Sequence, residues 1–192
     1  NYKIRRDVNG GWTMAQTEAA VSTLISEFGV ERFEYIEQPV ATIEELHHLQ
    51  LPIKIAGDEV IRKAADPFAI DLNGAVDVLI LKVAPLGGIN RALAIVKHHG
   101  LPAVVSSALE SAVGMVHELR LAAAIPNLEF ACGLGTGALF AKDVAQLPIR
   151  EGRIEIADVV PTGLDELMAS PERIAWWRQR IRDSFEVWQA RN

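Results

Sequence analysis

The segment Val78-Leu-Ile-Leu-Lys-Val-Ala-Pro-Leu-Gly-Gly88 holds four consecutive apolar residues, then a lysine, then a short loop that leads into a helical pattern at 90–99. A short apolar run that is bounded by turn residues and followed by a helix is typical of a buried strand in a βαβ unit. Gly100 closes the helical stretch, and another strand-like run begins at Ala103. The segment therefore predicts alternating strands and helices, and this pattern extends in both directions.

Six strand-like runs follow one another along most of the chain. They lie at Tyr2–Arg6, Phe33–Ile36, Ile53–Ala56, Val78–Leu81, Ala103–Val105 and Glu129–Ala131. The residues at or just after their ends are Asp7, Glu37, Asp58, Lys82, Ser106 and Gly133, which are 21 to 30 residues apart. A (β/α)8 barrel has a unit of about 30 residues. An open doubly wound sheet has similar units, so the spacing favours a barrel without excluding that sheet.

Helices are predicted between these strands from their capping signals. Thr13 with Gln16, and Thr42 with Glu45, have the spacing of a capping box, in which two side chains satisfy free backbone N–H groups. A further helix is predicted to begin at Ser107 and to run to about residue 124. Helices that join successive parallel strands imply right-handed crossovers.

The last part of the chain has a different pattern, which divides the sequence at about residue 145. Residues 147–158 alternate around Glu151-Gly152 and predict a hairpin, and Ser170-Pro171 predicts the start of a helix. The apolar stripe of that helix consists of Ile174, Trp177, Ile181, Phe185 and Trp188. We interpret this stripe as a packed helix face rather than a surface on which nucleic-acid bases stack.

Composition limits the possible classes of partner. The net charge is −6, whereas a protein that binds nucleic-acid phosphates usually has a basic excess. No apolar run approaches the roughly 20 residues that cross a bilayer. Cys132 is the single cysteine, so no internal disulfide can form, and a cytoplasmic location is expected. We therefore expect no nucleic-acid or membrane partner.

Three carboxylates are predicted to meet at one end of the sheet. Because parallel strands of a barrel deliver their C-terminal ends to the same rim, Asp7, Glu37 and Asp58 should lie close together. Each close pair would repel by about 4 kcal/mol at an effective dielectric constant of 20. Protonation, basic partners or a cation must offset that repulsion. A cation with all-oxygen ligands would be magnesium before zinc.

Lys82 reaches the same rim from the next strand. A lysine beside a metal site can act as a base, an acid or an electrostatic clamp. A metal that polarises a carboxylate, with a lysine near its α-carbon, is the arrangement that forms an enolate. One acidic residue at a strand end is more often a helix cap or a solvated group, but three in order followed by Lys82 are far more specific.

These residues lie in segments that resemble the enolase superfamily, and the muconate-lactonizing subgroup most of all. The segments are Asp7-Val-Asn9-Gly-Gly-Trp12, Glu37-Gln-Pro39, Gly57-Asp58-Glu59 and Lys82-Val-Ala-Pro-Leu-Gly-Gly88. The resemblance covers nearly the whole chain and implies a TIM-type (β/α)7β barrel that binds Mg2+. It implies that Asp7, Glu37 and Asp58 are the metal ligands, with Asn9 and Glu59 placed to orient them.

Two further segments resemble the o-succinylbenzoate synthases of this superfamily. They are Ser106-Ser-Ala-Leu-Glu-Ser-Ala-Val-Gly114 and Cys132-Gly-Leu-Gly-Thr136, while Val159-Val-Pro161 and Ala175-Trp-Trp-Arg178 resemble actinobacterial members. This resemblance implies a small carboxylate substrate whose tail contacts Ser106, Ser107, Gly133, Leu134, Gly135 and Thr136. The implied reaction is the magnesium-dependent dehydration of 2-succinyl-6-hydroxy-2,4-cyclohexadiene-1-carboxylate to o-succinylbenzoate, in menaquinone biosynthesis. Lys82 is the implied catalytic lysine that stabilises the enolate.

One part of the family pattern is missing from this chain. The family's base lies in a Lys-x-Lys motif one βα unit, about 30 residues, before Asp7, and only six residues precede Asp7 here. We expect the N-terminal capping domain and the first two barrel strands to be absent. Residues 1–145 would then supply strands three to eight, and residues 146–192 would pack on the barrel or on the capping domain. Six strands leave sheet edges exposed, so we expect this chain alone to be inactive and to need the missing segment.

Alternative functions remain open on the same residues. An N-acylamino acid racemase of this scaffold would use the same acids with two opposed lysines. A dipeptide epimerase fits less well, because Gly133-Leu-Gly135 stands where that family has Asp-x-Asp. An inactive, metal-binding remnant is the alternative outside catalysis.

Overall fold

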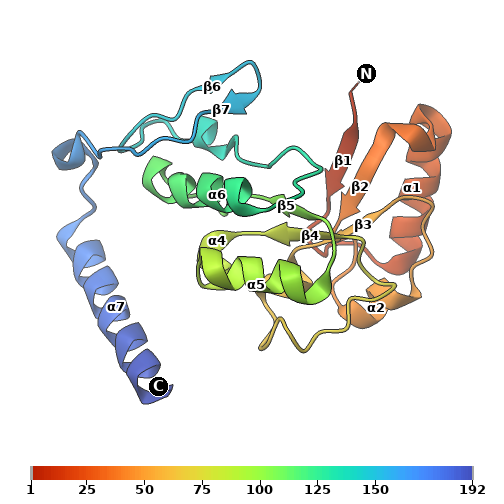
Figure 1. The fold of residues 1–192 in the computed structure, drawn as a ribbon, viewed down its shortest axis with the longest axis horizontal. Helices are drawn as coiled ribbons and strands as arrows, with labels where there is room; N and C mark the ends of the chain where they lie inside the picture. Colours follow the sequence, from red (N-terminus) through yellow and green to blue (C-terminus); the bar gives the residue numbers. More distant parts are fainter. Residues whose placement is uncertain (1, 192) are drawn as a thin grey trace.

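A five-stranded parallel sheet forms the centre of the protein (Figure 1), which is described by a computed structural model over residues 2–191. The strands are β1 (Ile4–Asp7), β2 (Phe33–Glu37), β3 (Ile55–Gly57), β4 (Val78–Leu81) and β5 (Ala103–Val105). They pair in sequential order, and every pairing is parallel. A doubly wound sheet reverses its strand order at a switch point. The sequential order therefore identifies the curled sheet of a half-barrel.

Helices connect these strands and cover one face of the sheet. They are α1 (Met14–Phe28), α2 (Ile43–His48), α3 (Glu59–Arg62), α4 (Val83–Leu86), α5 (Ile89–His99) and α6 (Ala112–Ala124), with 3-10 turns η1 (Val30–Arg32), η2 (Thr136–Leu139) and η3 (Leu164–Leu167). Both predicted capping boxes are confirmed, at Thr13 and at Thr42. α5 ends at Gly100, whose φ of +66° is accessible to glycine at little cost.

The two faces of the sheet bury different sets of residues. Along β4, Leu79 and Leu81 join the larger core that the helices cover, whereas Val78 and Ile80 join a small cluster on the inner side of the curl. This alternation is the period of two of a β-strand. By the same alternation Lys82, directly after β4, continues the inner series.

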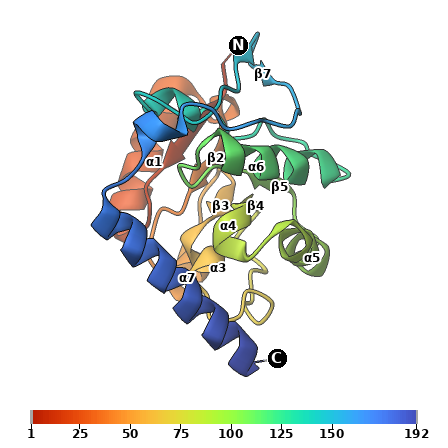
Figure 2. The same ribbon diagram turned by 90° about the vertical axis from the view of Figure 1, so that its left-hand side faces the viewer.

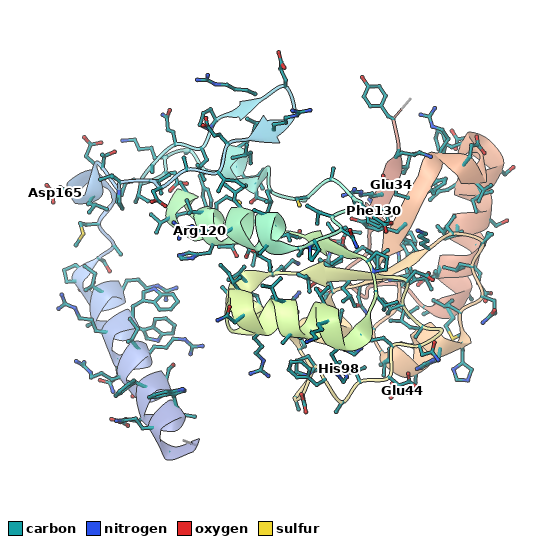
Figure 3. The ribbon with its side chains drawn as sticks, in the orientation of Figure 1. Glu34, Glu44, His98, Arg120, Phe130 and Asp165 are labelled. Carbon is teal, nitrogen blue, oxygen red and sulfur yellow. The ribbon has the colours of Figure 1, made fainter. Side chains whose placement is uncertain are left out.

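Arg5 spans the inner side of the curl. Its guanidinium lies over the ring of Tyr35, 4.9 Å from the ring centroid, and donates a 2.7 Å hydrogen bond to the carbonyl of Ala131. Phe130, which lies beside β1 and β2 in Figure 3, packs edge-on against the same tyrosine, with ring centroids 5.9 Å apart. These contacts tie β1 to the segment that follows α6.

The sixth predicted strand was wrong. Residues 129–131 form no strand, and the chain pairs with β5 only through a single parallel bridge between Ser106 and Gly133. The Gly133 N–H donates to the carbonyl of Val105 at 2.8 Å, so the pairing lies two residues beyond the end of the predicted strand. An apolar run extends as a strand only where its backbone groups find partners, and along this segment only one bridge forms.

The predicted start of α6 was also wrong. Ser107 and Glu110 do not begin the helix, because the Glu110 carboxylate accepts hydrogen bonds from the Ser107 hydroxyl and from the N–H of Ala108. This closes a loop in front of the helix. α6 begins at Ala112, with Ser111 as its N-cap.

A hairpin and a long helix follow this barrel part. β6 (Ile149–Arg150) and β7 (Arg153–Ile154) pair antiparallel around Glu151 and Gly152, which both have positive φ, as a two-residue hairpin turn requires. The predicted hairpin is therefore confirmed. The two predicted parts of the chain, residues 1–145 and 146–192, include residues 1 and 192, which lie outside the described residues.

The last helix, α7 (Pro171–Arg191), stands apart from the sheet and its covering helices (Figures 1 and 2). Ser170 caps it through a hydrogen bond from the N–H of Arg173. Its stripe residues Trp177, Ile181 and Phe185 are 49%, 65% and 53% exposed. Packing of this stripe on the barrel or on a capping domain stays a prediction. Across residues 2–191, no helix has both the length and the apolar character of a membrane span.

Candidate active site

Four charged residues gather at the C-terminal end of the sheet. Asp7 and Glu37 end β1 and β2 and are paired in register, Asp58 lies directly after β3, and Lys82 lies directly after β4. The predicted row of side chains therefore occupies one rim, because adjacent parallel strands end there.

Asp58 is the centre of a buried ion cluster. Its side chain is 1% exposed, and Lys82 Nζ lies 2.5 Å from its Oδ2, while Arg62 Nε lies 2.9 Å from its Oδ1. Arg62 also pairs with Glu59, whose Oε2 is buried and has no hydrogen-bond partner among the described residues. Two cations thus compensate the buried charge of Asp58, which would otherwise be strongly destabilising.

The carboxyl group of Glu37 titrates far above the usual range of a glutamate. Burial, and then the charges of Asp7 and Asp58, raise its pKa to about 7, against the opposing charge of Lys82. On the β1 side, the backbone N–H of Asn9 donates a 2.9 Å hydrogen bond to Asp7 Oδ1. The three carboxylates are electrostatically coupled, as their order in the sequence predicted.

The donor set fits a divalent cation in its chemistry. Carboxylate oxygens are the ligands that Mg2+ takes in proteins. The charges of Asp7 and Asp58 contribute, after burial, to the raised pKa of Glu37, so a cation near these groups would lower it. Among residues 2–191, however, no three acidic, histidine or cysteine side chains converge on one metal position. Lys82 and Arg62 engage both oxygens of Asp58, so a cation bound at this rim would compete with them.

Gln38 is a central residue of this rim that the sequence analysis quoted but gave no role. It is fully buried, and its Oε1 accepts hydrogen bonds from the N–H groups of Asp58 and Val60 at 3.1 and 3.2 Å. Its Nε2 donates to the carbonyl of Val40 at 2.9 Å, and its own carbonyl accepts from the N–H of Gly10. Gln38 thereby connects the loops that carry all three carboxylates. In the sequence, the only local indication of this role was that Gln38 is a polar residue between a predicted strand and Pro39.

Replacing Gln38 with glycine should lower the free energy of unfolding by about 2–4 kcal/mol, because two buried N–H groups lose their acceptor. Gln38 has a φ of +36°, which glycine adopts without strain, so the change isolates the lost amide. Urea unfolding measures the effect. Glu151→Gly is the matched control, since that exposed turn residue also has positive φ and should change stability by less than about 0.5 kcal/mol. Equal effects of the two changes would contradict the role of Gln38.

The Ser107 hydroxyl ties the two predicted substrate loops together. It donates to Glu110 Oε2 at 2.6 Å, and it accepts from the N–H of Leu109 and from the hydroxyl of Thr136 at 2.9 and 2.7 Å. One donor and two acceptor positions are all that a serine hydroxyl offers. The hydroxyl is therefore used within the protein, where it joins the loop after β5 to the Gly-rich turn.

The Gly-rich turn is held close to β5. A Cβ at Gly133 would lie 2.9 Å from Ser106 Oγ, so only glycine fits without a shift. Leu134 is 6% exposed and packs in the larger core, which leaves its backbone rather than its side chain toward the turn. Gly135 is the N-cap of η2, which begins at Thr136. All six predicted substrate contacts thus lie in two adjoining loops, while their contact with a substrate stays a prediction.

Cys132 lies directly before the Gly-rich turn. It is partly buried and packs against the larger core, and burial raises the pKa of its thiol. A thiol kept in its neutral form is a packing residue rather than a nucleophile.

Residues 1–164 match the enolase C-terminal domain-like family. The chain belongs to this family. It is 45% identical to the o-succinylbenzoate synthases of Mycobacterium tuberculosis and Mycobacterium bovis over 190 residues, which make up 96% of this chain and 57% of each relative. The chain therefore spans little more than half the length of these curated relatives.

Solved structures show the same fold. The muconate cycloisomerase from Pseudomonas fluorescens superposes with a TM-score of 0.70 at 26% identity, over 91% of this chain and 49% of that chain. The N-succinyl Arg/Lys racemase from Bacillus cereus gives a TM-score of 0.67 at 25% identity, over 78% and 42%. The predicted membership of the enolase superfamily is confirmed, as is a barrel-type sheet. The complete TIM barrel and the absent capping domain stay predictions.

Proposed function

We propose that this protein is an o-succinylbenzoate synthase, which dehydrates 2-succinyl-6-hydroxy-2,4-cyclohexadiene-1-carboxylate to o-succinylbenzoate for menaquinone biosynthesis. The 45% identity to mycobacterial enzymes of that name supports it. The observation that carries the proposal is the rim on which Lys82 lies 2.5 Å from the buried carboxylate of Asp58, beside Glu37 and Asp7. The proposed partner is a small carboxylate, without nucleic acid or membrane, in the cytoplasm.

The three rim carboxylates are the proposed Mg2+ ligands. Asp7, Glu37 and Asp58 would hold the ion, with Asn9 and Glu59 beside them. When bound, Mg2+ supplies positive charge next to the substrate's carboxylate, which lowers the cost of negative charge developing there. Glu37 must lose its proton to act as a ligand, and its pKa of about 7 makes this occur near neutral pH.

Lys82 supplies a second positive charge to the same region. The proposed reaction breaks a C–H bond next to the carboxylate, and then a C–O bond, so that the elements of water leave and the ring becomes aromatic. The Lys82 ammonium group would stabilise the negative charge that builds up between these two steps. Its ion pair with Asp58 holds it in place. The group that takes the proton is expected from the Lys-x-Lys segment of the family.

The two adjoining loops are the proposed site for the substrate's carboxylate tail. The hydroxyl of Ser107 is engaged by Glu110, Leu109 and Thr136, so it shapes the loops instead of binding the tail directly. The Gly133 N–H donates to the carbonyl of Val105. The backbone N–H groups from Leu134 to Thr136 are better placed for an anion, because a Gly-rich turn lets a ligand approach the backbone closely.

A side-by-side assay tests the proposal on the protein in the full form that its gene encodes. Formation of o-succinylbenzoate that requires Mg2+ is the expected result. Racemisation of N-acylamino acids in its place would favour the second candidate, which the fold similarity to the Bacillus cereus racemase supports. Neither activity, with Mg2+ bound, would identify an inactive metal-binding remnant.

A further inference from the structure

A buried carboxyl group on α6 has no role in the mechanism above. Glu118 is 1% exposed, and its Oε1 accepts a 2.7 Å hydrogen bond from the N–H of Val83, the residue directly after Lys82. Its Oε2 is also buried, and no hydrogen-bond donor reaches it among the described residues. A buried carboxylate oxygen without a donor is costly, so its environment calls for an explanation.

The neighbour of this oxygen is a second carboxyl group. Glu110 crosses the first turn of α6 over Gly114, where an added Cβ would lie only 2.6 Å from the Glu110 Cβ. Gly114 lies one turn before Glu118 on the same helix face, so the glycine lets the Glu110 side chain run toward Glu118. Glu110 is the neighbouring side chain that raises the pKa of Glu118, both through its charge and through a side-chain hydrogen bond. Neither of two carboxylates can donate, but one proton between them satisfies both.

We propose that Glu118 is a positioning residue that shares one proton with Glu110 and thereby fastens the loop of residues 106–111 to α6. The inference rests on the proposed function only in naming that loop as part of the substrate site. The structural part of the inference does not depend on that function. Glu110 accepts hydrogen bonds from the Ser107 hydroxyl and the N–H of Ala108, and the Ser107 hydroxyl accepts one from Thr136. A single proton on Glu118 therefore anchors both loops.

The shared proton makes the anchor sensitive to pH. Burial, and then the neighbouring Glu110, raise the pKa of Glu118 to about 8, against the lowering effect of the Val83 N–H and of the charge of Lys82. The other titratable group that interacts with it is the thiol of Cys132, on the segment after α6. Above about pH 8 the pair carries two negative charges that repel each other.

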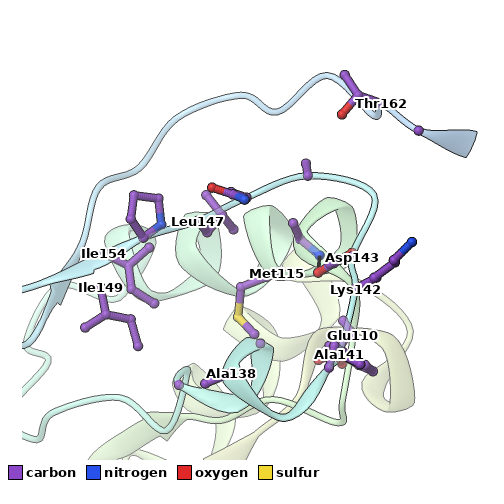
Figure 4. A pocket seen from close by; sticks show the side chains of 18 of the residues that line it. Glu110, Met115, Ala138, Ala141, Lys142, Asp143, Leu147, Ile149, Ile154 and Thr162 are labelled. Carbon is purple, nitrogen blue, oxygen red and sulfur yellow. Dashed lines mark hydrogen bonds between the residues drawn. The ribbon is translucent and has the colours of Figure 1, made fainter.

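The structure provides space for the loop to move when the pair separates. Glu110 also lines a cleft of about 640 Å³ that is enclosed by the start of α6, the segment around Lys142 and the hairpin (Figure 4). Lys142 lines the same cleft, where it pairs with Glu166 at 3.3 Å. A Glu110 carboxylate that leaves Glu118 can therefore turn toward the water of this cleft, and it would take Ser107 with it.

The test follows carboxyl and methyl signals of the protein by NMR from pH 6 to 9.5, so it needs no turnover. In the wild type, the Glu118 carboxyl carbon and the methyl groups of Ala108 and Leu109 should titrate together with a midpoint near 8. Glu118→Gln keeps an acceptor for Val83 and a donor for Glu110, so its methyl signals should stay constant. Glu110→Gln should lower the Glu118 midpoint by about one unit or more.

Exposed Glu155 is the matched control, and Glu155→Gln should titrate like the wild type. Loop methyl signals that do not titrate in the wild type, or that titrate equally in Glu118→Gln, would overturn the proposal. In an active enzyme, KM should rise about tenfold between pH 7 and 9 in the wild type but not in Glu118→Gln, with a smaller change in kcat. If the assay fails while the NMR result holds, the proposed function is wrong and the anchor stands.

Discussion

Replacing Lys82 with alanine is expected to lower kcat roughly a thousandfold and to destabilise the fold by about 3 kcal/mol. The two losses share one cause. The Lys82 ammonium is the proposed partner of the developing negative charge, and it is also one of the two cations that compensate Asp58, which is 1% exposed. Without it, Asp58 keeps only Arg62. Steady-state kinetics measure the first loss and urea unfolding measures the second.

A double-mutant cycle separates structure from catalysis. Asp58→Asn in the Lys82→Ala background removes the uncompensated buried charge, so most of the lost stability should return while turnover stays absent. Lys82→Arg keeps the positive charge and should retain most of the stability. Full activity in Lys82→Ala would remove this lysine from the mechanism, whatever the stability of the variant.

Short apolar runs predicted the central strands because every residue of β3, β4 and β5 is buried. The run at Val78–Leu81 contains no polar residue and is fully buried in the structure, so hydrophobicity alone located β4. The shorter run at 129–131, which begins with Glu129, lacks a continuous partner. Strand formation there depends on backbone pairing with distant segments, which local composition does not record. The predicted start of α6 was wrong for a related reason, because the Glu110 side chain accepts a hydrogen bond from the loop and does not cap the helix.

The rim of the site could be predicted because topology places it. Parallel strands end together, so the residues after them must meet, and their order in the sequence was enough to name Asp7, Glu37, Asp58 and Lys82. Residues that hold the rim from other elements were missed. Arg62 lies four residues after Asp58, which is the spacing of an ion pair on a helix. That signal was hidden because α3 has only four residues and was not predicted.

Glu118 could not have been found from its surroundings in the sequence. It lies in the middle of α6, between His117 and Leu119, and Arg120 is charged as well. Its partners are the backbone of Val83 and a carboxyl group that reaches it only because position 114 has no side chain. Contacts between side chains of different elements are set by packing, and a single sequence carries no direct record of them.

Mg2+ affinity should fall about tenfold for each pH unit below 7 and should level off above it. Glu37 has a pKa of about 7 in the folded protein, raised by burial and then by Asp7 and Asp58, and a protonated carboxyl is a poor ligand. Isothermal titration calorimetry in buffers of different ionisation enthalpy should show that binding at pH 6 releases close to one proton. Glu37→Gln should bind Mg2+ much more weakly and release none.

The same carboxyl predicts how stability responds to pH and to metal. Because the pKa of Glu37 is higher in the folded than in the unfolded state, its favourable contribution is complete below about pH 4.5 and is lost as pH rises through about 7. In metal-free wild type this loss should reach about 2–3 kcal/mol relative to Glu37→Gln. Mg2+ should reverse the loss in the wild type only, since the cation replaces the proton among the three carboxylates. If Mg2+ stabilised Glu37→Gln equally at pH 8, the ion would bind elsewhere, and the rim would be an ion-pair cluster without a metal.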